Sequence, residues 1–325
     1  MSAAARTPTF SIIIEWENVR FIDLNRTREM LRILRNELMS IQPPPRPPEI
    51  LFLYTVQNVP EALVHQVLTE DFKPSDLPAV TRVIPTDNLR YYEQKNFGGA
   101  HSTGEIKILL DSDVLPEPGW LSALLKSFQD PRVHVAAGQT YMAYDSFYTR
   151  AFALFWCWPL RDATSGLIPS TIFHANNVAY RSEIFDAYPF PNLPTNRDQC
   201  TMAARAMCAD GVGIYCQKEA RAAHPPPDGL WNFIKKGIND GRDQALLRRY
   251  RERSNLPEMR HIYWNFVQGV KRNFVKFRRQ YRDVGLSPVG AVGGFGLAVI
   301  WYALKAFGEF LTVTRPQLVT RLFPV

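Results

Sequence analysis

Residues 108–121 read ILLDSDVLPEPGWL, and this stretch decides the fold class. A mostly aliphatic run at residues 106–110 ends directly on Asp111-Ser112-Asp113. Such a short apolar run is typical of a buried strand. The two carboxylates lie on the same side of an extended turn, where they can hold a divalent ion together with phosphate groups. The pair alone is a weak signal, because turns favour aspartate for their own reasons.

Strand-like and helix-like segments alternate along the chain around this stretch. Strands are predicted at residues 10–14, 50–53, 80–84, 106–110 and 133–138, and helices near residues 31–41, 61–71, 120–128 and 197–210. This alternation predicts an α/β fold, a Rossmann-like, mostly parallel sheet flanked by helices. Ligands of such sheets bind at the carboxyl ends of the strands, so Glu15, Tyr54 and Asp111 are expected at one site.

Composition and charge exclude several classes of protein. The 325 residues are 46% apolar and 21% charged, which is typical of a globular chain and not of a disordered one. The net charge is +7, and six of the excess cations fall within residues 271–282, so a generally basic nucleic-acid binder is not expected. The four cysteines form no C-x-x-C pair, which excludes a typical zinc site or disulfide scaffold.

The C-terminal third changes character. Residues 229–283 are predicted to form a basic helical arm, and residues 284–304 contain no charged side chain over a length that could cross a bilayer. Glycines and a proline weaken the insertion signal. A transmembrane span, an interfacial segment and a buried soluble helix remain open. The basic tract before this segment favours contact with the cytoplasmic face of a membrane, which in a bacterium would be the inner membrane.

Four segments, together with the D-x-D stretch, resemble family 2 glycosyltransferases of the GT-A fold. They are FSIIIEWEN (10–18), YYEQKNFGGAHSTGEI (91–106), FHANNVAYRSEIF (173–185) and RDQCTMAARAMCADGVGIYCQKEARAAH (197–224). Their order along the chain matches the order in the family. The resemblance implies a GT-A domain at residues 10–228. The chain is therefore expected to comprise a tail at residues 1–9, this domain, the basic arm (229–283) and a transmembrane or membrane-associated tail (284–325).

The resemblance also implies a role for each site residue. The nucleotide sugar would be bound by Glu15, Glu17, Tyr54, Lys95 and Asp111; Asp113 and His224 would hold Mg²⁺ or Mn²⁺; Asn176 and Asn177 would lie on the acceptor side; and Asp198 would be the catalytic base. Two of these residues have plainer explanations. His224 can be an ordinary loop histidine, and Asp198 can be a carboxylate at a helix start.

The implied activity is that of an inverting, hexosyl-type glycosyltransferase. A nucleotide sugar, with UDP favoured, would donate to a saccharide or a lipid-linked envelope precursor in polysaccharide biosynthesis. Two departures leave the donor base uncertain: Glu15 replaces the family's usual proline, and Tyr54 replaces a common acidic residue. The alternative is a membrane-attached nucleotide-sugar-binding protein with the same fold and a degenerate catalytic site.

Overall fold

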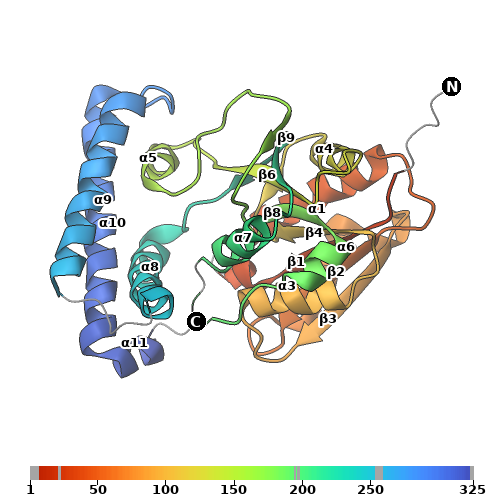
Figure 1. Cartoon of the computed structure of the whole chain (residues 1–325), viewed down its shortest axis with the longest axis horizontal. Coiled ribbons are helices and arrows are strands. Elements are labelled where there is room, and N and C mark those ends of the chain that lie inside the picture. The colour runs from red at the N-terminus through yellow and green to blue at the C-terminus, as the bar shows by residue number, and fades with distance from the viewer. Residues whose placement is uncertain (1–6, 21–22, 194, 196–197, 253–258, 323–325) are drawn as a thin grey trace. The chain divides into compact units, whose positions relative to one another are not determined.

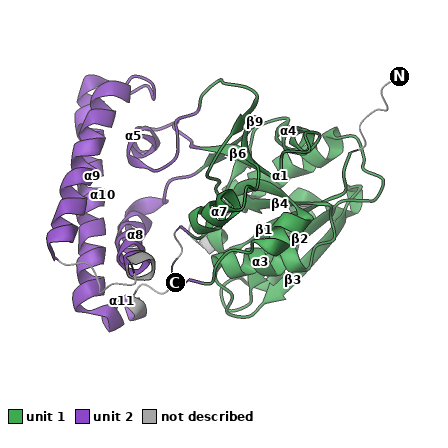
Figure 2. Cartoon of the chain, viewed as in Figure 1, with its two compact units in different colours: residues 1–140, 162–192, 199–224 green, residues 141–161, 193–198, 225–325 purple. Residues whose placement is uncertain are grey.

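The first strand, β1 (Phe10–Glu15), is buried at every position and lies inside the sheet. The structure is a computed structural model that describes residues 7–20, 23–193, 195, 198–252 and 259–322. The chain forms two compact units (Figure 2): residues 1–140, 162–192 and 199–224, and residues 141–161, 193–198 and 225–325. The second unit therefore includes two segments that lie within the range expected for the GT-A domain.

The strands of the described part form one sheet in the order β3-β2-β1-β4-β8-β6-β9-β5, and β7 pairs with β9 (Figure 1). Besides β1, the strands are β2 (Glu49–Thr55), β3 (Val80–Thr86), β4 (Ile106–Asp111), β5 (Leu115–Pro116), β6 (Val135–Met142), β7 (Leu167–Pro169), β8 (Asn177–Arg181) and β9 (Ile214–His224). All five strands predicted from the sequence are confirmed.

The expectation of a mostly parallel sheet is wrong for half of the sheet. Strands β3, β2, β1 and β4 are parallel, whereas β8 pairs antiparallel with both β4 and β6, and β9 pairs antiparallel with β5 and β7. The reason is that β8 inserts between β4 and β6, so the chain segment from β4 through a helix to β6 is not a crossover between neighbours. Alternation predicts parallel pairing only where consecutive strands are adjacent. The sheet is therefore mixed.

Helices cover both faces of the sheet in the first unit. One apolar cluster joins β1, β2 and β4 to α1 (Leu24–Ser40), α2 (Glu61–Val67) and α4 (Trp120–Ser127). A second cluster joins the opposite face to α3 (Tyr91–Ala100), α6 (Ser182–Ala187) and α7 (Gln199–Ala209). Alternating side chains of one strand supply both clusters: Ile12 and Ile14 face the first, and Ile13 faces the second.

The second unit is mainly helical. Its helices are α5 (Phe147–Phe155), α8 (Gly229–Glu252), α9 (Met259–Gln280), α10 (Pro288–Thr314) and α11 (Pro316–Leu322). Phe152 of α5 and Trp301 of α10 stack edge to face with ring centroids 5.3 Å apart in its core. This contact explains why α5 groups with the C-terminal helices. By length and composition, α10 could cross a membrane.

Candidate functional site

Three parallel strands end together at the edge of the sheet where the site forms. Glu15, the last residue of β1, is in register with Asp111 of β4 on one side and with Leu53 of β2 on the other. Since the first unit places these carboxyl ends side by side, the loops that follow them converge. Glu15, Asp111 and Asp113 are all buried there, with 0%, 3% and 4% of their surfaces exposed.

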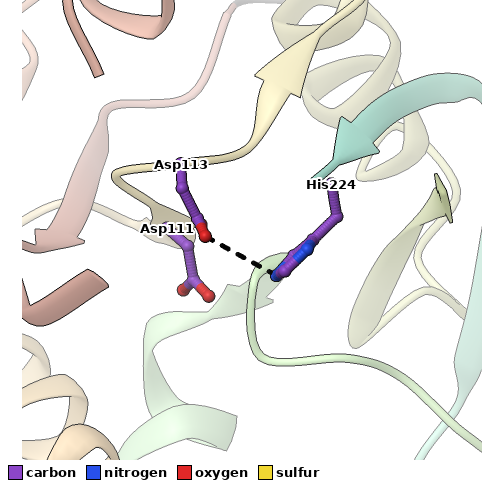
Figure 3. A group of neighbouring side chains, drawn as sticks. All are labelled: Asp111, Asp113 and His224. Carbon is purple, nitrogen blue, oxygen red and sulfur yellow. Dashed lines mark ion pairs between the residues drawn. The ribbon is translucent and has the colours of Figure 1, made fainter. Parts of the chain in front are cut away.

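Asp111, Asp113 and His224 form a group that could hold a metal ion (Figure 3). One ligand atom of each residue lies within 4.8 Å of the others, and His224 Nε2 lies 3.9 Å from Asp113 Oδ2. His224 ends β9, which pairs with β5 just after the aspartates, at Leu115 and Ala223. Two carboxylates and one imidazole form a donor set that suits Mn²⁺ or Mg²⁺. The residues present therefore fit the ion that the sequence implied.

Asp111 is held by a buried cation and a phenol from one helix. Lys95 Nζ lies 2.6 Å from Asp111 Oδ1, and neither side chain is more than 4% exposed. The Tyr91 hydroxyl donates to the same carboxylate at 2.9 Å. Tyr91 and Lys95 are four residues apart on α3, so both reach one target from one helix face. Side chains of α3 thus hold Asp111 in place, and Asp113 is the aspartate that pairs with His224.

Glu15 and Asn18 close the other side of this group. The Asn18 side-chain amide donates to Glu15 Oε1 at 2.9 Å and to Asp111 Oδ2 and Asp113 Oδ1 at 3.3 Å each. The backbone N–H of Glu17 donates to Glu15 Oε2 at 2.9 Å. One amide therefore links all three carboxylates of the site.

The crowding of carboxylates perturbs their titration. Burial raises the pKa of Glu15 well above its ordinary value, and the neighbouring charges of Asp111 and Asp113 raise it further, against the lowering effect of Lys95. Burial also raises the pKa of Asp111, partly opposed by Lys95. Burial lowers the pKa of His174 to about 4, and the charge of His224 contributes to that shift. The site therefore favours added positive charge near Glu15 and Asp111.

Glu17 belongs to a polar network at the end of β2. It accepts from the backbone N–H of Thr55 at 3.0 Å and from the Asn58 side chain at 2.8 Å. Gln94 of α3 donates to Glu17 at 3.2 Å and to the Thr55 hydroxyl at 2.8 Å. The network places a carboxylate, amides and a hydroxyl next to Glu15, at the end of β2.

Arg26 of α1 ties together the two segments that bear the candidate ligands. Its Nε donates to the Asp113 carbonyl at 2.6 Å, and its Nη2 donates to the Ala223 carbonyl at 2.7 Å. Ala223 immediately precedes His224. The guanidinium fork thus fixes the loop of Asp113 against the end of β9.

Two predicted site residues, Tyr54 and Asn177, are buried among other elements of the fold and contact residues outside the group that could hold a metal ion. The Tyr54 ring lies in the apolar cluster with Trp16 and Phe52, and 1% of the residue is exposed. Asn177 accepts from Trp120 Nε1 at 2.7 Å and donates to the Ala220 carbonyl at 3.1 Å, both between buried elements. Asn177 of β8 thus links helix α4 and strand β9.

Asn176 is buried and accepts from the Thr140 hydroxyl at 3.1 Å. Asp198 is half-buried and immediately precedes α7, with a positive φ of 59°. A helix N-cap normally has extended backbone, so Asp198 is not an ordinary cap. Aspartate is one of the few residues that adopt this left-handed conformation, which occurs often at functional positions.

Sequence reasoning missed Asn18, Tyr91 and Arg26 as site residues. Asn18 and Tyr91 lie inside the quoted segments, and the four-residue spacing of Tyr91 and Lys95 on one helix was a usable signal. Arg26 had no such signal, because its two partners are 87 and 197 residues away along the chain.

Residues 66–188 match the sequence pattern of Glycosyl transferase family 2, which confirms the predicted resemblance. A solved structure of the mannosyltransferase PcManGT from Pyrobaculum calidifontis, in complex with GDP-Man and Mn²⁺, is similar in fold, with a TM-score of 0.56. The alignment covers 96% of this chain and 88% of that one at 15% identity. No protein with a curated description shows a significant match.

Proposed function

We propose that this chain, with its match to family 2 glycosyltransferases, transfers a hexosyl group from a nucleotide sugar to an acceptor hydroxyl with inversion. The observation that supports this most strongly is the convergence of Asp111 and Asp113, at the carboxyl end of the parallel strand β4, with His224 at the end of β9. Their donor atoms suit a divalent cation, and the buried Lys95 beside Asp111 adds a fixed positive charge. Both charges favour a diphosphate at this edge.

Asp113 and His224 would hold Mg²⁺ or Mn²⁺, and Asp111 would contact the ribose or the metal-bound diphosphate. A cation bound there would neutralise the negative charge that develops on the departing nucleoside diphosphate. The protein's own contribution is to hold the ligands before the donor arrives. Lys95, Tyr91 and Asn18 orient the carboxylates, so little reorganisation is needed during the reaction.

The donor is proposed to lie along Glu15, Glu17 and Lys95. The Glu17 network at the end of β2 supports a nucleoside at this position, and the backbone of Thr55 takes part there where the ring of Tyr54 does not. UDP-sugars remain the first expectation. GDP-mannose joins them in any test, because the structurally similar mannosyltransferase is described in complex with it.

Asp198 is proposed as the base that takes the proton of the acceptor hydroxyl. The proposal depends on the resemblance of its segment to the family and is consistent with its left-handed backbone. A positioned carboxylate makes a sugar hydroxyl a better nucleophile by removing its proton in the transition state. The acceptor is proposed to be a lipid-linked or envelope saccharide at the cytoplasmic face of the cell membrane, since the C-terminal unit contains the apolar helix α10.

Turnover of defined variants tests this proposal. Release of nucleoside diphosphate would be measured with UDP-sugars and GDP-mannose, in the presence of Mn²⁺ and a mixture of saccharide and lipid-linked acceptors. Asp198→Asn should lower kcat by about 10²- to 10⁴-fold, the usual contribution of a general base. Asp113→Asn should abolish the increase in turnover that Mn²⁺ produces in the wild type.

Two surface aspartates of the first unit serve as matched controls. Asp210, which accepts from Tyr188, and Asp130, which pairs with Arg132, can each be changed to Asn without touching the site. Full turnover in Asp198→Asn would contradict the assignment of the base. Donor binding without turnover in the wild type, with every acceptor, would favour the nucleotide-sugar-binding alternative.

A further inference from the structure

Helix α10 turns its charged side chains inward and an apolar stripe outward. Between residues 289 and 310, every exposed residue is apolar, and these residues recur at spacings of mainly three and four: Val289, Val292, Gly293, Gly296, Ile300, Ala303, Phe307 and Phe310. The stripe is about 30 Å long at 1.5 Å per residue. Lys305 instead pairs with Asp240 of α8 at 2.7 Å, and Glu309 accepts from Asn265 of α9. A helix of this kind is suited to an apolar medium on its outer side.

Charged helices of the same unit pack beside the middle of α10. A Cβ at Gly269 of α9 would lie 2.1 Å from the Tyr302 ring, and a Cβ at Gly294 would lie 2.8 Å from the Phe277 ring of α9. The exposed Lys271 and Arg272 of α9 lie between these two contact points in the sequence. If α10 crossed a bilayer, these cations would be carried to the depth of the hydrocarbon, which is strongly disfavoured.

Helix α9 has the composition of a helix that lies at a membrane surface. From Arg260 to Arg282 the sequence has seven Lys or Arg and no Asp or Glu. Aromatic side chains are exposed among them at Tyr263, Trp264 and Phe274. Phe274 contacts Phe295 of α10 with ring centroids 5.6 Å apart, so the aromatic side of α9 continues onto α10. Basic and aromatic side chains together favour anionic headgroups and the boundary below them.

We infer that the apolar stripe of α10 and the basic, aromatic side of α9 form one face that rests in the plane of an anionic bilayer. Helix α10 lies on this membrane and does not cross it. We assign a lipid surface as the binding partner because the face combines the apolar stripe of α10 with the cationic side of α9. This pattern of apolar and positively charged groups complements a bilayer with anionic headgroups. The inference concerns the second unit alone and does not depend on sugar transfer.

Vesicle flotation of the full chain tests binding. The protein should float with vesicles that contain phosphatidylglycerol and stay unbound with phosphatidylcholine alone, and salt should weaken the binding. Ile300→Glu on the stripe should lower the bound fraction about tenfold or more, since one isoleucine no longer reaches an apolar environment. Met39→Glu on α1 is the matched control, because Met39 and Ile300 are 58% and 52% exposed. Ile300→Leu should bind as the wild type does.

Protease accessibility tests the orientation. The protein would carry a tag at each end and would be either added to preformed vesicles or reconstituted in them. A helix that lies in the plane of the membrane leaves both tags on one side of the bilayer. External protease should therefore remove both tags from the same molecules. Protection of one tag alone would show that α10 spans and would overturn the inference. Absence of binding to anionic vesicles would also overturn the inference. A wild type that is a dimer in solution and becomes a monomer in Ile300→Glu would overturn it too, because a second copy of the chain would then cover the stripe.

Discussion

Glu15, Asp111 and Asp113 are buried carboxylates whose mutual repulsion is partly offset by Lys95. At the residue scale, a bound cation would offset the remaining repulsion between these carboxylates. The site is stable without one only to the extent that Lys95, Tyr91 and Asn18 hold the carboxylates in place. Its behaviour should therefore depend on both pH and divalent metal.

The pH dependence of stability follows from the direction of the pKa shifts. Glu15 and Asp111 have raised pKa values in the folded protein, so the folded chain binds their protons more tightly than the unfolded chain does. The contribution of these two carboxyls to the free energy of unfolding should fall as pH rises from about 4, the ordinary carboxyl value, through the raised values. His174, whose pKa is lowered to about 4, contributes the opposite trend between that value and its ordinary 6.5. Mn²⁺ requires the deprotonated carboxylates, so its stabilising effect should grow over the same pH range.

Urea unfolding at several pH values, with and without Mn²⁺, measures both effects. Asp113→Ala is the comparison, because it should remove most of the Mn²⁺ effect. An Mn²⁺ effect of the same size at pH 5 and pH 8 would show that the ion binds elsewhere.

At the scale of elements, α1 acts on the site through one side chain. Arg26 bridges the carbonyls of Asp113 and Ala223, and so fixes the distance between two loops that bear candidate ligands. Groups that orient metal ligands typically change metal affinity by 10- to 100-fold when they are removed.

Arg26→Ala should therefore weaken Mn²⁺ binding by about 10- to 100-fold, and Arg26→Lys should restore part of it, because a lysine reaches one carbonyl but has no fork. Mn²⁺ titration by electron paramagnetic resonance gives the affinity. Arg32→Ala, on the outer side of α1 where Arg32 pairs with Asp71, is the matched control. Equal Mn²⁺ affinity in Arg26→Ala and Arg32→Ala would contradict the role of Arg26.

The sequence predicts the parallel half of the sheet well because β1, β2 and β4 are buried, mostly apolar runs and helices alternate with the strands. It does not predict the antiparallel half, because nothing in β8 itself shows that it inserts between β4 and β6. The same limit applies to the site. Asp111, Asp113 and His224 were predicted and lie together, whereas the buried hydrogen bonds of Asn177 depend on Trp120 and Ala220, which are far away in the sequence.

At the scale of the whole molecule, we propose a different role for each unit: donor and metal binding for the first, and membrane binding for the second. The first unit holds the candidate donor and metal site, and the second presents an apolar stripe on α10 beside the basic α9. Lipid-linked acceptors would be consumed at a membrane surface, which the second unit is proposed to bind. Loss of vesicle binding in Ile300→Glu with normal donor binding would show that the two activities are separable.

Donor binding tests the central claim most directly. Thermal and urea unfolding of the full chain would be followed with UDP-, GDP- and dTDP-sugars, with and without Mn²⁺, in the wild type and in Asp113→Ala. A donor at a hundred times its dissociation constant should add about 2.7 kcal/mol to the free energy of unfolding. The account predicts that one nucleotide class stabilises the wild type only with Mn²⁺ and does not stabilise Asp113→Ala. Equal stabilisation of both proteins, or none by any donor with Mn²⁺ present, would contradict it.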